Sequence, residues 1–387
     1  MKSRQDAGAY PSRFVALDAW RGIASFFVVL HHLYSHRSAV TEYFYLFVQL
    51  FFVISGYCLA AATNRAVGEG MGVGTFMLRR VRRIGPPYLA SVAFALGCYF
   101  LRGLSLGGMA SAIREVTYPW WYYLQNLTMT QWLTMTVNYY EHRSVVPWGT
   151  GVCFNPPHWS LNYEEQFYLL MGCAVLLAIW IRPAVTLLVL TVSVALAGAK
   201  IRAGFTGLFC DYWLQFATGL ILYYRLCVAQ TVRARRILDV VTALLLALVV
   251  WVAYRGGELA FDSNLQQYYG QLAVCMAFAA LLLVMRRWDH VITSNLVGKL
   301  LCRFGAISYS LYLVHYPFIK LTWHIHERIE GAINERSADL IIILAIVGVS
   351  YLFYLAFEKP FVNRNRREQA AIARAAAKQN PGPRCML

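Results

Sequence analysis

The chain contains 387 residues, of which 59% are hydrophobic, 15% are aromatic and only 14% are charged. Soluble domains carry about 25% charged residues, so this composition excludes an ordinary soluble domain and indicates an integral membrane protein. The formal net charge is +16, but the basic residues cluster between apolar segments, which indicates membrane topology and not nucleic-acid binding. The nine cysteines lack the paired spacing that holds zinc, so no metal site is expected.

Ten segments are apolar enough to be predicted as membrane-spanning helices, since about 20 largely apolar residues cross a bilayer. They cover residues 14–33, 43–62, 88–106, 161–181, 183–199, 206–229, 237–254, 265–285, 300–319 and 338–357. Basic residues gather in alternate connections, including the loops 65–83 and 225–236, and the positive-inside rule puts these loops and both termini in the cytoplasm. The sequence therefore predicts an all-α, polytopic membrane helical bundle of about ten transmembrane helices over residues 1–362, and a basic, disordered cytoplasmic tail over residues 363–387.

The connection over residues 107–159 is rich in aromatic side chains and is extracytoplasmic in this topology. These side chains are Trp120, Trp121, Tyr122, Tyr123, Trp132, Tyr139, Tyr140 and Trp148. Tryptophan and tyrosine form anchor belts at membrane interfaces, which is the interpretation we favour. Aromatic rings also stack on sugars, so a platform that binds a glycan acceptor stays open as the alternative.

The first predicted helix carries Asp18, Arg21, His31 and His32 inside an apolar segment. Ionisable groups are costly in a bilayer and usually face a polar cavity or a partner. Arg21 and His32 are eleven residues apart, which on a helix is three turns plus about 20°, so both should share one face about 16 Å apart. That span is comparable to the pantetheine arm of coenzyme A. The alternative is a structural Asp18–Arg21 ion pair with two interfacial histidines.

The fourth predicted helix is preceded by His158 and opens with an acidic pair, Glu164 and Glu165. In the predicted topology these carboxylates lie near the level of His32. A histidine that is hydrogen-bonded to a carboxylate has a fixed tautomer and is a good general base for a hydroxyl. The two glutamates point about 100° apart, so we expect only one to face a cavity. The alternative is that acidic residues complement the helix dipole. The same stretch supplies three candidate substrate-binding residues, Trp159, Ser160 and Tyr168.

Four arginines precede the third predicted helix at its cytoplasmic mouth. They are Arg79, Arg80, Arg82 and Arg83, and Tyr88 follows them after two prolines. Guanidinium groups suit the 3′-phosphate and diphosphate of coenzyme A, so these residues and Tyr88 are candidates for binding an acyl-CoA. Positive-inside topology alone is an equally good explanation.

The ninth predicted helix carries His315 in its outer half, two residues before Pro317. A proline loosens the helical backbone, so His315 is a further candidate for substrate binding. The motif Glu358-Lys359-Pro360 ends the last helix, and we interpret it as structural.

These motifs, in this order, resemble acyltransferase family 3. The motifs are Arg21 with ten residues before His32, the run Phe51 to Tyr57, the run Arg83 to Tyr88, Trp159-Ser160-Leu161 followed by Glu164 to Tyr168, Ser308-Tyr309 with His315-Tyr316-Pro317, and Glu358-Lys359-Pro360. The resemblance covers nearly the whole chain and implies ten core helices, acyl-CoA as donor, O-acylation of cell-surface or exported glycans, and Arg21 with His32 as the essential pair. Gln49 departs from the pattern, because relatives often carry an aspartate there.

The sequence therefore predicts a transmembrane O-acyltransferase of the bacterial inner or plasma membrane. We expect acetyl-CoA, or another acyl-CoA, to be a donor substrate and not a permanently bound cofactor, and the acceptor to be a glycan or a lipid-linked oligosaccharide. His32, Glu164, Glu165 and Arg21 are the predicted catalytic residues, acting by direct transfer or through an acyl-histidine. Membrane lipid is an expected partner, nucleic acid is not, and the oligomeric state stays open. The main alternative is a transporter or flippase that uses the same charges as a path, and the least favoured is a structural scaffold.

Overall fold

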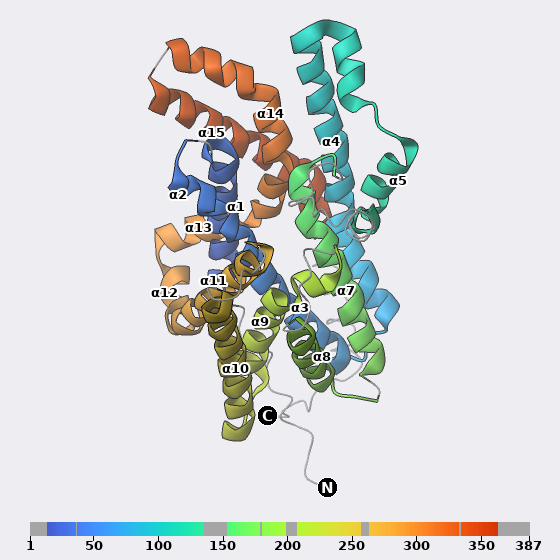
Figure 1. The fold of residues 1–387 in the computed structure, drawn as a ribbon, viewed down its shortest axis with the longest axis vertical. Helices are drawn as coiled ribbons and strands as arrows, with labels where there is room; N and C mark the ends of the chain where they lie inside the picture. The colour runs from blue at the N-terminus through green and yellow to red at the C-terminus, as the bar shows by residue number, and fades with distance from the viewer. Residues whose placement is uncertain are drawn as a thin grey trace, which may run out of the picture. The chain divides into compact units, whose positions relative to one another are not determined.

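A computed structural model describes residues 14–35, 37–134, 153–178, 180–198, 207–256, 263–332 and 334–362 (Figure 1). Every regular element within these ranges is helical. The helices form two compact units that alternate along the chain. The first unit comprises Met1–Glu69 with Ala174–Ser308, and the second comprises Gly70–Cys173 with Tyr309–Leu387.

The first unit is built on α1, α3, α9, α11 and α13. Its described helices are α1 (Ala16–Tyr34), α2 (Ala39–Glu42), α3 (Phe47–Gly68), α8 (Pro183–Gly198), α9 (Trp213–Tyr223), α10 (Val232–Gly256), α11 (Ser263–Met285), α12 (Asp289–Ser294) and α13 (Leu296–Ala306). Glycines let two of these backbones approach closely. A Cβ atom added to Gly219 of α9 would lie 1.9 Å from the carbonyl oxygen of Val53 in α3, so this contact requires glycine.

The second unit contains α4 (Val73–Val116), α5 (Trp120–Thr128), α14 (Ser308–Ala332) and α15 (Glu335–Phe353), together with most of α7 (Trp159–Leu177). A π-helical turn, Tyr354–Glu358, follows α15. Its hydrophobic core is formed by Ile84, Tyr88, Val92, Tyr122, Phe154, Leu161, Leu313, Val314 and Phe353.

Four described helical segments are long and apolar enough to cross a membrane. They are Ala39–Gly68, Val73–Val116, Gly270–Ile292 and Glu335–Val362. A broken pair, Leu296–Ala306 with Ser308–Trp323, passes the same test as one span. Large apolar side chains on α15 are exposed, for example Leu344 at 61% and Leu352 at 66%, and a face of this kind suits lipid. The predicted helical membrane class is therefore confirmed, whereas the number of ten spans and the cytoplasmic termini stay predictions.

The third predicted span, residues 88–106, lies within a longer helix, and the predicted loop before it was wrong. The helix α4 begins at Val73, so the four arginines lie within a helix and not in the predicted loop 65–83. Arginine is a good helix former, and the helix continues through Pro86 and Pro87. At its other end α4 reverses direction at Gly107 and Gly108 (Figure 1), where Gly108 has φ of 68°.

The ninth predicted span, residues 300–319, was wrong as one continuous helix. The chain leaves the helical hydrogen-bond pattern at Ile307, between α13 and α14. Gly305 precedes the break, and glycine is about 1 kcal/mol less favourable than alanine in a helix. The short backbone contact that Gly305 makes with α1, described below, explains why a better helix former is not used there.

The aromatic connection is partly helical. Its Trp120, Trp121, Tyr122 and Tyr123 lie in α5. Tyr122 is buried in the core of the second unit, whereas Trp120 is 76% exposed. Tyr122 therefore packs in the protein interior, and of these two rings only Trp120 is exposed at the surface. The predictions for Tyr139, Tyr140 and Trp148, and for the tail 363–387, fall outside the described residues.

Candidate functional site

The helix α1 carries the predicted Arg21–His32 pair. It runs without interruption from Ala16 to Tyr34, so the predicted shared face of Arg21 and His32, about 16 Å apart along the axis, is preserved. Both side chains are half-buried. One rigid element thus presents a guanidinium and an imidazole in fixed register.

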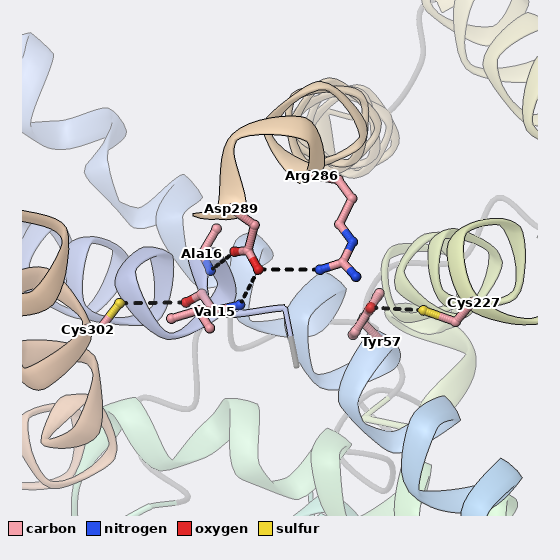
Figure 2. A network of polar contacts seen from close by, with 7 residues as sticks. All are labelled: Val15, Ala16, Tyr57, Cys227, Arg286, Asp289 and Cys302. Carbon is pink, nitrogen blue, oxygen red and sulfur yellow. Dashed lines mark hydrogen bonds and ion pairs between the residues drawn. The ribbon is translucent and has the colours of Figure 1, made fainter. Parts of the chain in front are cut away.

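The first turn of α1 is capped by a residue that is far away in sequence. The Asp289 carboxylate accepts hydrogen bonds from the backbone N–H groups of Val15 (3.2 Å) and Ala16 (2.9 Å). Arg286 pairs with the same carboxylate at 3.3 Å, as Figure 2 shows. Because the first N–H groups of a helix have no partner within the helix, this carboxylate fixes where α1 begins.

The middle of α1 packs on α13 through glycines. A Cβ atom on Gly22 would lie 2.8 Å from the backbone nitrogen of Gly305, and a Cβ atom on Gly305 would lie 1.7 Å from the carbonyl oxygen of Asp18. The backbone of α13 therefore lies directly against the turn that precedes Arg21.

The other end of α1 holds two adjacent histidines with different surroundings. The Nδ1 atom of His31 lies 3.2 Å from the carbonyl oxygen of Thr41, and a carbonyl only accepts, so His31 Nδ1 is the donor. The ring of His31 also lies 6.0 Å from the ring of Tyr45. His31 is thus held by the segment that leads to α3, and the role predicted for His32 stays a prediction.

The two predicted glutamates of α7 have different roles. Tyr168 donates a hydrogen bond of 2.7 Å to Glu164 Oε1, one helical turn away. Glu165 is half-buried, and its Oε2 atom has no hydrogen-bond partner among the described residues. Of these two glutamates, Glu165 is the one with a buried carboxylate oxygen that lacks a hydrogen-bond partner in the described part of the chain.

Two of the four predicted arginines lie near this acidic segment. Arg80 and Arg83 both act electrostatically on Tyr168, as Glu164 does. Arg80 also lies over the Phe76 ring at 5.5 Å, and all four arginines are half-buried. The arginines and the carboxylates were predicted as separate groups. Their proximity depends on residues 73–87 being helical, which was not predicted.

The other predicted binding residues are occupied by contacts inside the second unit. Tyr88 is buried, donates a hydrogen bond to the carbonyl oxygen of Asn126 (2.6 Å) and accepts one from Gln131 Nε2 (2.8 Å). Ser160 Oγ lies 2.7 Å from the Tyr312 hydroxyl. Trp159 is buried with its ring 6.0 Å from that of Tyr163. Their predicted roles in binding stay predictions.

His315 and Glu358 lie on α14 and at the end of α15. His315 is fully buried, and its Nδ1 donates to the carbonyl oxygen of Leu311 at 2.9 Å. Glu358 accepts a hydrogen bond of 2.6 Å from Ser310, in agreement with a structural role for this motif. In the first unit, Gln49 is fully buried, and its amide atoms have no partner in the described part of the chain.

Sequence reasoning missed one group of polar residues, Ser91 and Asn155, which contact His158 inside the second unit. A signal for Asn155 was available, because Pro317 has no N–H and must leave the carbonyl of Leu313 without its helical partner. Asn155 donates to that carbonyl.

The protein is a helical membrane protein with an arginine and a histidine on one capped helix, and with acidic and arginine residues close together in the second unit. These residue types are suited to group-transfer chemistry. The family model of acyltransferase family 3, an acyltransferase domain, matches residues 14–355, and the chain belongs to this family.

Two curated proteins are similar to parts of the chain. One is "Protein 2 in picA locus" of Rhizobium radiobacter, 36% identical over 92 residues, which cover 24% of this chain and 48% of that protein. The other is the peptidoglycan O-acetyltransferase OatA of Listeria monocytogenes, 23% identical over 369 residues, which cover 86% of this chain and 54% of that protein. The chain thus spans about half the length of both relatives. No solved structure is significantly similar to it.

Proposed function

We propose that this protein is a transmembrane O-acyltransferase, which moves an acyl group, most simply acetyl, from cytoplasmic acyl-CoA to a hydroxyl of an extracytoplasmic or lipid-linked glycan. A bacterial inner membrane is the proposed location. The observation that carries the proposal is the unbroken α1, which keeps Arg21 and His32 in register over about the length of a pantetheine arm. The family and the name of the relative OatA support the acyl group and the glycan.

The donor would be held by its phosphates. Arg79, Arg80, Arg82 and Arg83 are half-buried on one helix, and forked guanidinium groups pair well with phosphate oxygens. The pantetheine arm would then extend past Arg21 toward His32.

The transfer step needs one base and no redox partner. His32 Nε2 or Nδ1 takes the proton of the acceptor hydroxyl, and the hydroxyl oxygen attacks the thioester carbon. The carbon–sulfur bond then breaks, an ester forms, and the coenzyme A thiolate recovers the proton from His32. Glu165 would orient the acceptor, because its Oε2 atom is the carboxylate oxygen that lacks a partner among the described residues.

The experiment follows label from radioactive acetyl-CoA into the glycan fraction of membranes that contain wild-type protein, His32→Ala or His31→Asn. The amide nitrogen of Asn at position 31 takes the position of Nδ1 and retains a donor for the Thr41 carbonyl, so this variant is the matched control. We expect wild type and His31→Asn to transfer label and His32→Ala to lose it, with equal amounts of protein in the membrane.

Two results would contradict the proposal. Transfer that persists in His32→Ala would remove His32 from the reaction. Absence of transfer by wild type, with several acyl donors supplied and with glycan still crossing the membrane, would favour the transporter alternative.

A further inference from the structure

In the second unit, the tautomer of His158 follows from a hydrogen bond that is missing in α14. In α14, Pro317 has no N–H, so the carbonyl of Leu313 lacks its i+4 partner. Asn155 fills the gap, because its Nδ2 atom lies 2.6 Å from that carbonyl oxygen. Since a carbonyl only accepts hydrogen bonds, this contact fixes which end of the Asn155 amide is the NH₂ group.

The second hydrogen of the Asn155 NH₂ group reaches His158. The distance from Asn155 Nδ2 to His158 Nε2 is 3.0 Å, and the contact is attractive only if Nε2 carries a lone pair. Ser91 Oγ also lies 3.0 Å from Nε2, and 2.7 Å from the carbonyl oxygen of Tyr88, so its one hydrogen is shared between two acceptors. The neutral His158 ring must therefore carry its hydrogen on Nδ1.

The surroundings of His158 keep the ring neutral. Its side chain is fully buried and its ring centroid lies 4.8 Å from that of Tyr88. Burial lowers the pKa of His158 from 6.5 to about 3, and the nearby His315 adds to this effect. At neutral pH His158 is thus a donor at Nδ1 and an acceptor at Nε2.

The Nδ1–H group of His158 has no hydrogen-bond partner among the described residues, and neither has Glu165 Oε2. His158 ends the short 3-10 turn Pro156–His158, and Glu165 lies in the second turn of α7, which follows directly. Both interact with Tyr88: the His158 ring contacts the Tyr88 ring, and the Glu165 carboxylate acts electrostatically on Tyr88. A buried N–H donor and a buried carboxyl oxygen, both beside Tyr88, complement the hydroxyl groups of a sugar ring, because each hydroxyl can both accept and donate.

We propose that His158 and Glu165 form a hydroxyl-binding pair for the glycan acceptor. The Nδ1–H group of His158 donates to one hydroxyl oxygen of the acceptor sugar, and the Glu165 carboxylate accepts from a hydroxyl of the same ring. This inference rests on the proposed function and adds the acceptor subsite. His158 makes no covalent bond in the reaction and moves no proton.

Two substitutions separate the donor from the structural contact. In His158→Gln the side-chain oxygen takes the position of Nε2 and still accepts from Asn155, but the Nδ1 donor is lost. In His158→Asn the amide nitrogen takes the position of Nδ1, while the contact with Asn155 is lost. A matched control is His326→Gln, because His326 is also a buried histidine of the second unit and pairs with Asp339 at 3.0 Å.

The first readout is the transfer of label from acetyl-CoA to glycan, measured at increasing concentrations of the glycan fraction from the cells that express the protein. We expect His158→Gln to raise the glycan concentration for half-maximal transfer about tenfold, the loss of one hydrogen bond, with the acetyl-CoA dependence unchanged. His158→Asn should keep the wild-type glycan dependence at a lower thermal midpoint, and His326→Gln should keep it too. Unchanged glycan dependence in His158→Gln would overturn the proposal. So would equal changes for both substrates, or a lower thermal midpoint in that variant, because these indicate a structural role.

The second readout does not require acyl transfer. Saturating glycan fraction should raise the thermal midpoint of wild-type protein in detergent, because a ligand stabilises the state that binds it. It should raise the midpoint of His158→Gln less. If wild type is stabilised but transfers no label, the proposed enzyme fails while the hydroxyl-binding pair stands. If the glycan stabilises neither protein, the pair is refuted.

Discussion

Gly305 of α13 lies so close to Asp18 of α1 that an added Cβ atom would be 1.7 Å from the Asp18 carbonyl oxygen. Asp18 is one turn from Arg21, so this backbone contact sets the position of the helix that carries the proposed reaction centre. Small residues at helix interfaces in membranes allow such approach, and a larger residue must separate the helices.

Gly305→Ala is therefore expected to destabilise the protein by about 1–3 kcal/mol, the usual cost of overpacking. The control is Gly270→Ala in α11, where a Cβ atom would meet nothing within 4 Å and where alanine should raise helix stability slightly. Thermal midpoints in detergent compare the two variants. An equal midpoint for both variants would show that α1 and α13 can move apart without a loss of stability, which would contradict the prediction.

The cap on α1 gives a second prediction. Asp289→Ala removes the acceptor for two backbone N–H groups (Figure 2), and losing a cap costs about 1 kcal/mol. The amides of Val15 and Ala16 should exchange hydrogen faster, as measured by mass spectrometry. Asp239→Ala is the control, since the Arg225–Asp239 pair lies on the surface with the Asp239 side chain 55% exposed and exposed pairs contribute little. Equal exchange at α1 in both variants would contradict the role of the cap.

Much of the fold could be predicted because lipid imposes a simple rule. Apolar runs of sufficient length become helices, and α1 and α15 begin and end within a few residues of the predicted spans. The limits of α4 could not be predicted from hydropathy, because its first turns contain four arginines. The break at Ile307 was also missed, because one glycine is a weak signal for a break and the contact of Gly305 with α1 cannot be read from the sequence.

The candidate site was predictable only where a spacing defined it. The spacing of Arg21 and His32 could be read from the sequence because one helix carries both. The distinction between Glu164 and Glu165 could not, since it depends on the Tyr168 hydroxyl that binds one of them. For Asn155 the signal was indirect, because the missing N–H of Pro317 indicates an unpaired carbonyl but not the donor, which lies 158 residues away.

The protonation of His158 gives a third prediction. Burial first, and His315 second, lower the pKa of His158 to about 3 in the folded protein, against about 6.5 in an unfolded chain. Between pH 6.5 and 3 the unfolded state therefore binds a proton that the folded state does not, so stability should fall with decreasing pH by up to about 1.4 kcal/mol per unit. The thermal midpoint should decrease more from pH 7 to pH 5 for wild type than for His158→Gln. Parallel falls would show that His158 accepts a proton in the folded state.

The relation between Pro317 and Asn155 gives the last prediction, which is a coupling. Asn155→Ala leaves the Leu313 carbonyl buried without a donor, which costs about 1–3 kcal/mol. Pro317→Ala restores the N–H that would bond this carbonyl within α14. Asn155→Ala should therefore cost less in the Pro317→Ala background, by about 1 kcal/mol in a double-mutant cycle of unfolding free energies. The cost does not vanish, because Asn155 also binds His158. Gln131→Ala, which removes a bond to Tyr88, should be additive with Pro317→Ala. If Asn155→Ala is additive as well, the asparagine does not compensate for the proline, and the tautomer assigned to His158 loses its basis.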